Sequence, residues 1–238
     1  MSIQENFTDD SILNGKILLR QPKKGYRVAI DPIILASLIE PTDNQEILDV
    51  GCGVGAISLI LKRKNRSAKV TAIDIDENMC ELCRYNSEKN SLELSVKNIG
   101  IENMPRENFY DLVVTNPPFF SKGSSRVSAT KELANFETME LSDWISLCLN
   151  LLKNKGIFSI IHDTSRIGDI LAAIKGRAGS AEIIPIFPKE NKEAVRVVVR
   201  CVKGSFSKTK MHRGIVMHSE NGKYSEVAKK ILDEAKLY

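Results

Sequence analysis

The sequence predicts an α/β, Rossmann-like fold, with a mostly parallel sheet that closes with an antiparallel carboxyl-terminal hairpin. Three observations predict it. Apolar runs typical of buried strands alternate with amphipathic stretches typical of helices. A glycine-rich turn at 51–55 joins one such run to a helix, as in nucleotide-binding α/β proteins. Two apolar runs near the end of the chain, 182–187 and 194–202, are close enough to pair as a hairpin.

Composition fits one large α/β domain. The 238 residues are 42% hydrophobic, which allows a sizeable core. We expect a lead-in over 1–45, the main domain over 46–203 and a strand–helix extension over 204–238. No apolar run approaches the ~18 residues that cross a bilayer, and the start lacks the features of a signal peptide. A cytoplasmic protein without membrane contact is therefore expected. We also expect a monomer.

Cysteine spacing gives little sign of metal binding. Cys80 and Cys83 form a CxxC pair, but no second pair or histidine pair with zinc spacing accompanies it. The pair falls in a helical pattern, which favours two buried thiols. We expect no metal.

Positive charge is locally concentrated. The chain has 34 basic and 30 acidic residues, for a net charge of +4. Residues 16–27 hold five basic residues and no acid, and 189–213 hold eight basic residues and two acids. A third segment, 122–131, is small, polar and basic, which is typical of a loop at the rim of a cleft and equally of a disordered stretch. Such segments suit a polyanion such as a nucleic acid, although a solvated basic face is a common alternative.

The lead-in is predicted to hold a hairpin and a helix. Leu13 and 17–19 can pair around Asn14-Gly15, a good turn dipeptide. Asp31 is the expected cap of a helix that has Pro32 as its first residue and ends at Pro41.

The main domain and the extension follow in order. Strands are predicted at 46–50, 69–73, 93–97, 112–115, 157–161, 182–187, 194–202 and 215–217. Helices are predicted from residue 56 onward and at 77–90, 141–152, 165–175 and 224–236. Asp76 is the expected cap of the helix 77–90, Ser142 is the expected cap of the helix 141–152, and Gly156 is expected to terminate the latter. Residues 99–110 are predicted as a loop.

The glycine turn has the spacing GxGxG, at Gly51, Gly53 and Gly55. Glycines let a backbone approach a ligand closely, and the following helix offers free amides. Dinucleotide dehydrogenases instead use GxGxxG. Asp49 lies two residues before the first glycine, where its charge suits a ligand with an ammonium and a sulfonium group. The pattern favours S-adenosylmethionine over NAD.

A second acid completes an adenosine-binding pattern. Asp74 ends a predicted strand about 20 residues after the glycines, where an acid can accept both ribose hydroxyls. Ile75 follows it and is expected beside the cofactor. Asn98, after the third strand, either contacts the adenine edge or is a loop asparagine without a ligand.

Asn116-Pro117-Pro118-Phe119-Phe120 follows a buried strand. The two prolines prevent both a strand and an ordinary helix from continuing, which predicts a stiff turn at the carboxyl end of the strand. Open α/β sheets place ligand sites at that end. The alternative is an ordinary Pro-Pro turn followed by two core phenylalanines.

Together these stretches resemble a known family. Residues 48–55 resemble the first motif of class I S-adenosylmethionine-dependent methyltransferases, Asp74 matches their ribose acid, and 116–119 matches the (N/D)PP(Y/F) motif of amino-methyltransferases. Residues 25–32 resemble the tRNA1(Val) (adenine-37-N6)-methyltransferase family, and so do four stretches of the carboxyl-terminal part, 176–179, 185–188, 196–203 and 222–224. Asn98 departs from the pattern, because many class I enzymes have an acid there.

The resemblance implies methylation of N6 of adenine in tRNA, at position 37 of valine tRNA. The Asn116 side-chain oxygen and the Pro117 carbonyl would accept the amine hydrogens, and Phe119 would stack on the extruded base. The implied cofactor residues are Tyr26, Asp49, Gly51, Gly53, Gly55, Asp74, Ile75, Asn98 and Asn116. The RNA would contact the basic segments 16–27, 122–131 and 189–213.

Other readings stay open. The acceptor can be a guanine N2 in rRNA or a glutamine N5 in a protein, although glutamine enzymes normally carry a recognition domain where this chain has about 45 residues. A catalytically inactive RNA-binding module is another class, but it would be expected to lose Asp49, Asp74 or Asn116. A NAD-dependent oxidoreductase is disfavoured by the glycine spacing.

Overall fold

The computed structural model describes residues 6–25, 27–105, 108–117 and 139–237. The elements, in chain order, are β1 (Phe7–Ile12), β2 (Ile17–Pro22), α1 (Asp31–Ser37), β3 (Glu46–Val50), α2 (Ala56–Lys64), β4 (Lys69–Asp74), α3 (Glu77–Lys89), β5 (Ser95–Asn98), β6 (Tyr110–Thr115), α5 (Leu141–Leu151), β7 (Leu152–Asp163), α6 (Ile167–Ile174), β8 (Ala178–Lys189), β9 (Arg196–Lys203), β10 (Lys210–Met211), β11 (Ile215–His218) and α7 (Glu226–Glu234). Short 3₁₀ turns occupy Ile101–Asn103 and Thr164–Arg166.

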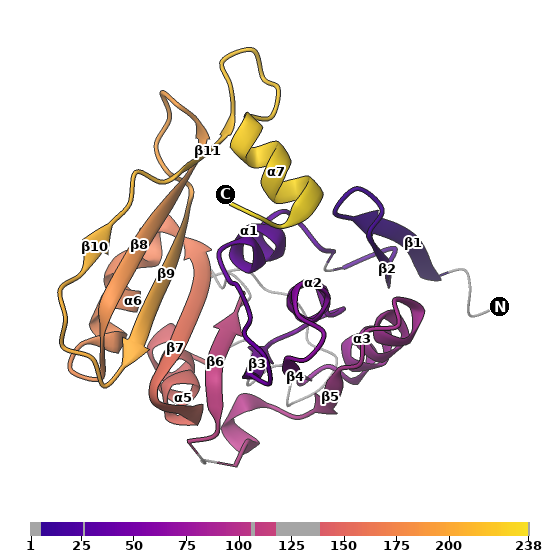
Figure 1. Cartoon of the computed structure of the whole chain (residues 1–238), viewed down its shortest axis with the longest axis horizontal. Helices are drawn as coiled ribbons and strands as arrows, with labels where there is room; N and C mark the ends of the chain where they lie inside the picture. Colours follow the sequence, from indigo (N-terminus) through magenta and orange to yellow (C-terminus); the bar gives the residue numbers. More distant parts are fainter. Residues whose placement is uncertain (1–5, 26, 106–107, 118–138, 238) are drawn as a thin grey trace.

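A central sheet organises the molecule (Figure 1). Its strands are ordered β10-β8-β9-β7-β6-β3-β4-β5, and β11 also pairs with β8. Strands β3, β4, β5, β6 and β7 are parallel, whereas β9 runs antiparallel to both β7 and β8. This confirms the predicted mostly parallel sheet with an antiparallel carboxyl-terminal hairpin.

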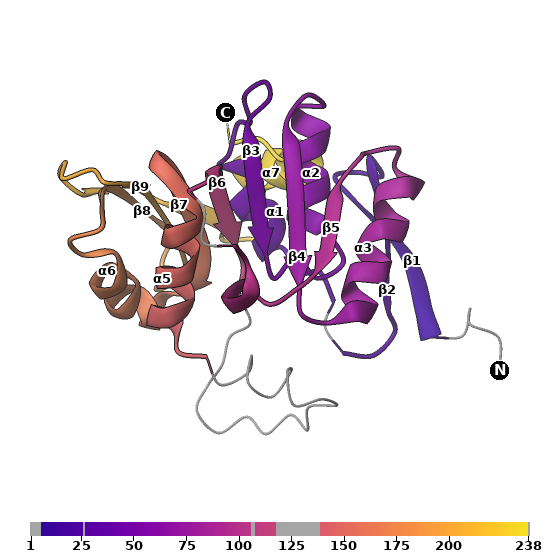
Figure 2. The same cartoon turned by 90° about the horizontal axis from the view of Figure 1, so that it is seen from below.

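Helices cover both faces of the sheet (Figure 2). Helices α1, α2 and α7 share one buried apolar cluster with Ile47 of β3, while α5 and α6 share another with Leu48 of the same strand. Adjacent strand residues point to opposite faces, so a strand buried on both sides is apolar throughout. Phe158 of β7 is fully buried in the second cluster, and burying such a side chain stabilises the fold by about 1.5–3 kcal/mol.

The amino-terminal hairpin is a separate two-stranded antiparallel sheet, β1 with β2. It lies beside α3 in both views (Figures 1 and 2). The predicted hairpin is confirmed, but its strands are longer, because Ile12 pairs with Ile17 and the turn spans 13–16. Asn14 and Gly15 both have positive φ, at 53° and 78°, a conformation that asparagine and glycine tolerate best.

The prediction of Asp31 as a helix cap is wrong. Ile30 is the N-cap residue of α1 and makes no side-chain cap bond, while Asp31 and Pro32 lie in the first turn. The Asp31 carboxylate instead accepts a 2.9 Å hydrogen bond from Arg196 Nε of β9. Asp31 therefore pairs with a residue 165 positions further along the chain, and does not cap the amides of its own helix. The helix also ends at Ser37, before the predicted stop at Pro41.

Two predicted signals around α5 are also wrong. Ser142 lies inside the helix, whose N-cap residue is Glu140 without a side-chain bond. Gly156 does not end the helix, because β7 already begins at Leu152 and Gly156 lies within that strand. A Cβ at Gly156 would lie 2.9 Å from the Lys153 carbonyl oxygen, so crowded backbone requires the glycine.

The remaining predicted elements are present with shifted ends. The strand predicted at 93–97 begins at Ser95, the strands predicted at 182–187 and 194–202 occupy Ala178–Lys189 and Arg196–Lys203, and the last helix covers Glu226–Glu234. Asp76 caps α3 as predicted, because its side chain accepts from the Asn78 amide. The five cysteines are free and buried, which confirms Cys80 and Cys83 as buried thiols. Within the described ranges, every helix is too short or too polar to cross a membrane.

Parallel pairing brings the carboxyl ends of four strands to one edge of the sheet. Val50 pairs with Thr115 and Asp74 pairs with Asn98, so the residues that follow β3, β4, β5 and β6 are neighbours. This edge holds most of the residues that the sequence singled out, and it is where open α/β sheets bind ligands.

Candidate active site

The glycine turn leaves β3 and enters α2 with a tightly fixed backbone. Gly51, Gly53 and Gly55 all have positive φ, at 70°, 53° and 91°. The amides of Gly51 and Cys52 both donate to the Ile73 carbonyl oxygen at 2.9 Å. Gly55 is the N-cap residue of α2 and makes no side-chain cap bond. A ligand can therefore approach the bare backbone and the first amides of the helix.

Asp49 lies beneath this turn and is completely buried. One carboxylate oxygen, Oδ2, accepts hydrogen bonds from the hydroxyl group and the amide of Ser58, at 2.7 and 3.1 Å. The other, Oδ1, is buried, and no group in the described part of the chain donates a hydrogen bond to it. Burial raises the pKa of Asp49 to about 7. A cation bound nearby would favour the ionised form and compensate the unpaired oxygen.

Asp74 and Asn98 form the next part of the site. The Asp74 carboxylate accepts from the Gly53 amide at 2.8 Å and from the Asp76 amide at 3.0 Å. Burial raises the pKa of Asp74. The Asn98 side-chain amide donates to the carbonyl oxygens of Asp74 and Ile75, at 3.1 and 2.9 Å. Asn98 therefore holds the turn after β4, while its side-chain oxygen can still accept a hydrogen bond from a ligand.

Asn116 emerges from β6 beside the glycine turn. Its side-chain oxygen is buried and has no hydrogen-bond partner among the residues that the structure describes, and Pro117 is buried after it. A buried acceptor without a partner is costly in a folded protein, and a ligand that supplied a donor would remove this cost. Phe119 and Tyr26 lie outside the described residues, as does the predicted loop 122–131.

Three residues that support the site were not predicted from the sequence. Ser58 holds Asp49, the Thr115 hydroxyl donates to the Val50 carbonyl oxygen at 2.8 Å, and the Trp144 indole donates to Thr115 at 3.1 Å. Each is a polar group inside a strongly apolar element. A polar group within an apolar element is the sequence signal that could have identified these residues, because a polar group is costly to bury unless it is hydrogen-bonded.

Arg196 is the first residue of β9 and lies beside the carboxyl end of β7, at the same edge of the sheet. It contacts Asp31 of α1 at 2.9 Å and Asp163 of β7 at 3.2 Å. His162, next to Asp163, is buried, and its Nδ1 accepts from the Asp163 amide. Burial lowers the pKa of His162 to about 4, so the ring is neutral at neutral pH. These contacts anchor the end of the lead-in beside β7.

The donors and acceptors on this edge fit S-adenosylmethionine. The Asp49 carboxylate suits a positively charged group, the Asp74 carboxylate can accept ribose hydroxyls, and the glycine turn leaves room for a close approach. Among the described residues, no group of three or more histidine, cysteine or acidic side chains could hold a metal ion.

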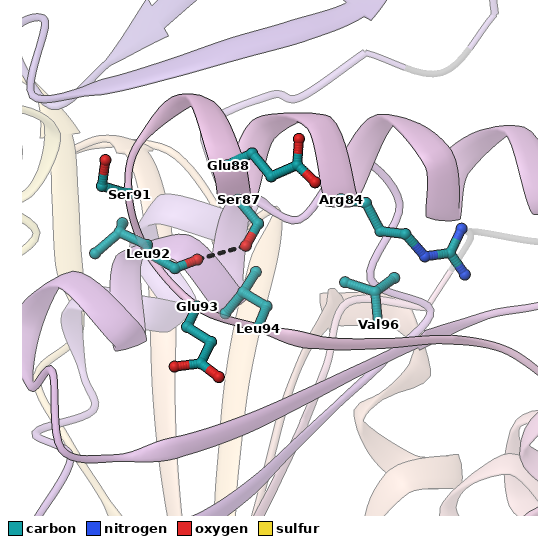
Figure 3. Close-up of a pocket in the computed structure, with 8 residues that line it drawn as sticks. All are labelled: Arg84, Ser87, Glu88, Ser91, Leu92, Glu93, Leu94 and Val96. Carbon is teal, nitrogen blue, oxygen red and sulfur yellow. Dashed lines mark hydrogen bonds between the residues drawn. The ribbon is translucent and has the colours of Figure 1, made fainter.

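A separate pocket lies away from this edge (Figure 3). It has a volume of about 520 Å³ and is formed by the end of α3 and the loop that leads into β5, where Ser87 donates to the Leu92 carbonyl oxygen. Its lining residues are Arg84, Ser87, Glu88, Ser91, Leu92, Glu93, Leu94 and Val96. None of the residues predicted for the site is among them. The pocket carries two acids on an open surface and has no feature that indicates a nucleotide.

Comparison with known proteins places these observations in context. Residues 29–163, more than half of the chain, match the family described as methyltransferase small domain. Over 187 residues, which cover 76% of this chain and 78% of the relative, the sequence is 26% identical to the tRNA1(Val) (adenine(37)-N6)-methyltransferase of Dyadobacter fermentans.

Solved structures share the fold at low sequence identity. A predicted O-methyltransferase from Agrobacterium tumefaciens superposes with a TM-score of 0.73 at 22% identity, covering 87% of this chain and 98% of the other. A 16S rRNA N2 methyltransferase from T. thermophilus, in complex with AdoMet and guanosine, gives a TM-score of 0.60 at 18% identity, covering 83% and 50% of the two chains.

Proposed function

The chain belongs to the methyltransferase small domain family, and we propose that it methylates N6 of an adenine in tRNA, at position 37 of valine tRNA. It is an S-adenosylmethionine-dependent methyltransferase, as the family match and the relatives indicate. The observation that supports methylation of an exocyclic amine is the buried side-chain oxygen of Asn116, which follows β6 beside the glycine turn and has no partner among the described residues. The choice of adenine in tRNA rests on the names of the relatives.

Asn116 supplies what an aromatic amine needs from an enzyme. The nitrogen lone pair of adenine N6 is delocalised into the ring, so the amine is a poor nucleophile. The Asn116 oxygen and the Pro117 carbonyl oxygen would each accept one N6 hydrogen, which draws the nitrogen toward tetrahedral geometry and stabilises its developing positive charge. Bound S-adenosylmethionine supplies the electrophilic methyl group.

The other predicted residues serve the cofactor. Asp49 would hold its methionine part through charge or an intervening water, and Asp74 would accept the ribose hydroxyls. Ile75 follows Asp74 at the end of β4, Asn98 ends the neighbouring strand β5, and both would border the adenine, with the Asn98 oxygen as its acceptor. Tyr26 and Phe119 are proposed, from the family resemblance alone, to contact the cofactor or the base.

The family names of the relatives support tRNA as the substrate, and the charge distribution favours one surface for it. In the segment 16–27, two of the five cations are paired with acids, Arg20 with Asp9 and Arg27 with Asp10, while Lys16, Lys23 and Lys24 are exposed. The stretch 206–213 differs, because every residue in it is exposed and it contains three cations and no acid. Phe206 is 88% exposed within it.

Register places this stretch, which we call the β10 edge (residues 206–213), level with the site. Met211 of β10 pairs with Ile183 of β8, which pairs with Val199 of β9. Val199 also pairs with Ile160 of β7, and Ile160 pairs with Thr115 of β6. Four strand spacings of about 4.8 Å separate Met211 from the residue before Asn116, or about 19 Å. A structured RNA can bridge that distance while one nucleotide is extruded into the site.

A guanine N2 in rRNA is a second candidate, because the structural neighbour from T. thermophilus is an rRNA N2 methyltransferase seen with guanosine. Guanine N2 is also an exocyclic aromatic amine, and the Asn116 oxygen would accept its hydrogens equally well.

Transfer of radiolabel from S-adenosylmethionine distinguishes these acceptors. The purified protein is incubated with tRNA or rRNA from a strain that lacks the modification, and the RNA is digested to nucleosides. Label in N6-methyladenosine from valine tRNA is expected. Label in a methylguanosine from rRNA alone would move the substrate to the second candidate, and label in neither would contradict an RNA acceptor.

A further inference from the structure

The outer edge of β2 is paired with two side chains instead of a strand. Leu18 donates its amide to Asn90 Oδ1 at 2.9 Å, and Asn90 Nδ2 donates to the Leu18 carbonyl oxygen at 2.7 Å. Arg20 and Asn86 make the same reciprocal pair, at 2.7 and 3.0 Å. Each asparagine amide thus imitates the donor and acceptor of a neighbouring strand.

The spacing of the two elements makes this possible. Asn86 and Asn90 are one helical turn apart on α3, a rise of about 6 Å. Leu18 and Arg20 are two residues apart on β2, a rise of about 6.8 Å. Both contacts can therefore form without bending either element, and together they fix the hairpin to α3.

Asn86 does more than Asn90, because it also reaches the glycine turn. Asn86 is completely buried, and its second amide hydrogen is donated to the Val54 carbonyl oxygen at 3.0 Å. Val54 lies immediately before Gly55. The second amide hydrogen of Asn90 stays on its own helix, at the Asn86 carbonyl oxygen. One buried side chain therefore joins the hairpin to the cofactor turn.

The hairpin in turn leads to the far side of the site. The Val28 amide donates to Gln21 Oε1 at 2.8 Å, and Arg27 contacts Asp10, so the segment after β2 folds back on the hairpin. Asp31 is then held by Arg196. The lead-in is thus anchored at the glycine turn through Asn86 and at the end of β7 through Asp31.

We propose that Asn86 is a positioning residue that couples the hairpin to the glycine turn, so that cofactor binding and hairpin stability depend on each other. The proposal rests on cofactor binding at the glycine turn, as in the proposed function, and not on the identity of the methyl acceptor. Coupling of this kind is reciprocal, so it has two readouts. A cofactor that orders the turn must also stabilise the hairpin, and loosening the hairpin must weaken the cofactor.

The test compares Asn86→Leu with the matched variant Asn90→Leu. Calorimetry measures the dissociation constant of S-adenosylmethionine, and hydrogen–deuterium exchange follows the amides of residues 7–22 with and without it. In the wild-type protein the cofactor is expected to slow exchange in the hairpin. In Asn86→Leu the affinity falls by about 10- to 100-fold and the cofactor no longer slows that exchange. In Asn90→Leu the hairpin exchanges faster, but the affinity stays within about threefold and the cofactor still slows exchange.

Several results would overturn the proposal. Wild-type affinity in Asn86→Leu would do so, and so would equal losses of affinity in both variants, since the Val54 contact would then contribute nothing. If Asn86→Leu does not fold, Asn86→Ala replaces it, with Asn90→Ala as its match, because the smaller side chain removes the bonds to Arg20 and Val54 without adding bulk or charge. Absence of cofactor binding in the wild-type protein would instead refute the proposed function, and this proposal with it.

Discussion

The Thr115 hydroxyl donates a 2.8 Å hydrogen bond to the Val50 carbonyl oxygen, which joins the last residue of β6 to the last residue of β3. The next residues along the two strands are Asn116 and Gly51. Trp144 supports both, because its indole donates to Thr115 and its ring would lie 3.6 Å from a Cβ at Gly51. In the proposed function, this hydroxyl bridge would help the paired strands β3 and β6 to hold Asn116 beside the glycine turn.

Replacement of Thr115 by valine tests this bridge. The change keeps the shape but removes the hydroxyl, so we expect a loss of about 1–3 kcal/mol in the free energy of unfolding and a fall in kcat of about tenfold as Asn116 shifts. Urea denaturation and steady-state kinetics measure the two effects. Ser159→Ala on β7 is the control, since the buried Ser159 hydroxyl has no partner and its removal should be neutral or stabilising. Equal effects of the two substitutions would contradict a role for the bridge.

Because the pKa of Asp49 is raised, we expect the stability of the folded protein to fall with rising pH and its affinity for the cofactor to increase. Burial raises its pKa to about 7 in the folded protein, whereas an unfolded chain titrates near ~3.9. Between these two pKa values the folded protein holds a proton on Asp49 that the unfolded chain has released. The resulting contribution to the free energy of unfolding is fully present below the pKa of the unfolded chain and is lost as the pH rises through about 7. A cationic cofactor favours the carboxylate, so its affinity should rise over the same window.

Thermal denaturation without cofactor and calorimetry with it, both from pH 5 to pH 8, check this pair of trends. Asp49→Asn should flatten both of them and weaken the cofactor at the upper end. A cofactor affinity of the wild-type protein that does not change with pH would show that Asp49 does not interact with the bound ligand.

Gly55 should tolerate alanine poorly. Its φ of +91° is strained for any side chain, and a Cβ would lie 2.6 Å from Cys83 Sγ. Gly15 offers a matched comparison, because its φ is +78° but nothing lies within 4 Å of a Cβ. Gly15→Ala should cost about 1 kcal/mol for the backbone alone, and Gly55→Ala should cost about 1–3 kcal/mol more for overpacking. Chemical denaturation of both variants measures the difference, and equal costs would mean that the contact with Cys83 relaxes freely.

The β10 edge should carry phosphate contacts. Replacing Lys208, Lys210 and Arg213 by serine should raise the KM for RNA and reduce the salt dependence of RNA binding by about two to three units of slope. The dissociation constant of the cofactor should not change. The control replaces Lys229, Lys230 and Lys236 around α7, which removes the same charge from another exposed surface. If both triple variants lose RNA affinity to the same extent, the effect is one of net charge and the β10 edge has no special role.

The sequence predicted the sheet and the residues at its carboxyl edge because these follow from local patterns. Apolar runs that end in Asp74 or Asn116, and glycines that need positive φ, can be recognised within a few residues. Parallel pairing then brings the strand ends together without further information. The residues placed at this edge are described by the structure except for Tyr26 and Phe119.

Contacts between distant residues could not be predicted in this way. Asp31 has every local feature of a cap, yet Arg196 takes its carboxylate from across the fold. Asn86 and Ser58 are polar residues within predicted helices, and only the packing of α3 and α2 shows what they bind. Charge counted along the sequence was also incomplete, because the acids of β1 that pair with Arg20 and Arg27 lie outside the segment 16–27.

The most direct test of the account is the paired measurement of methyl transfer and cofactor affinity in Asn116→Ala. We expect kcat to fall by about 100- to 1,000-fold or more, because the acceptor for the amine hydrogens is lost, while the dissociation constant of S-adenosylmethionine stays within about threefold of wild type. Asn116→Asp, which keeps an oxygen in place, should retain part of the activity. Methyl transfer by Asn116→Ala at a rate near that of the wild-type protein would contradict the central role of this oxygen, and parallel loss of turnover and cofactor affinity would assign Asn116 to the cofactor alone.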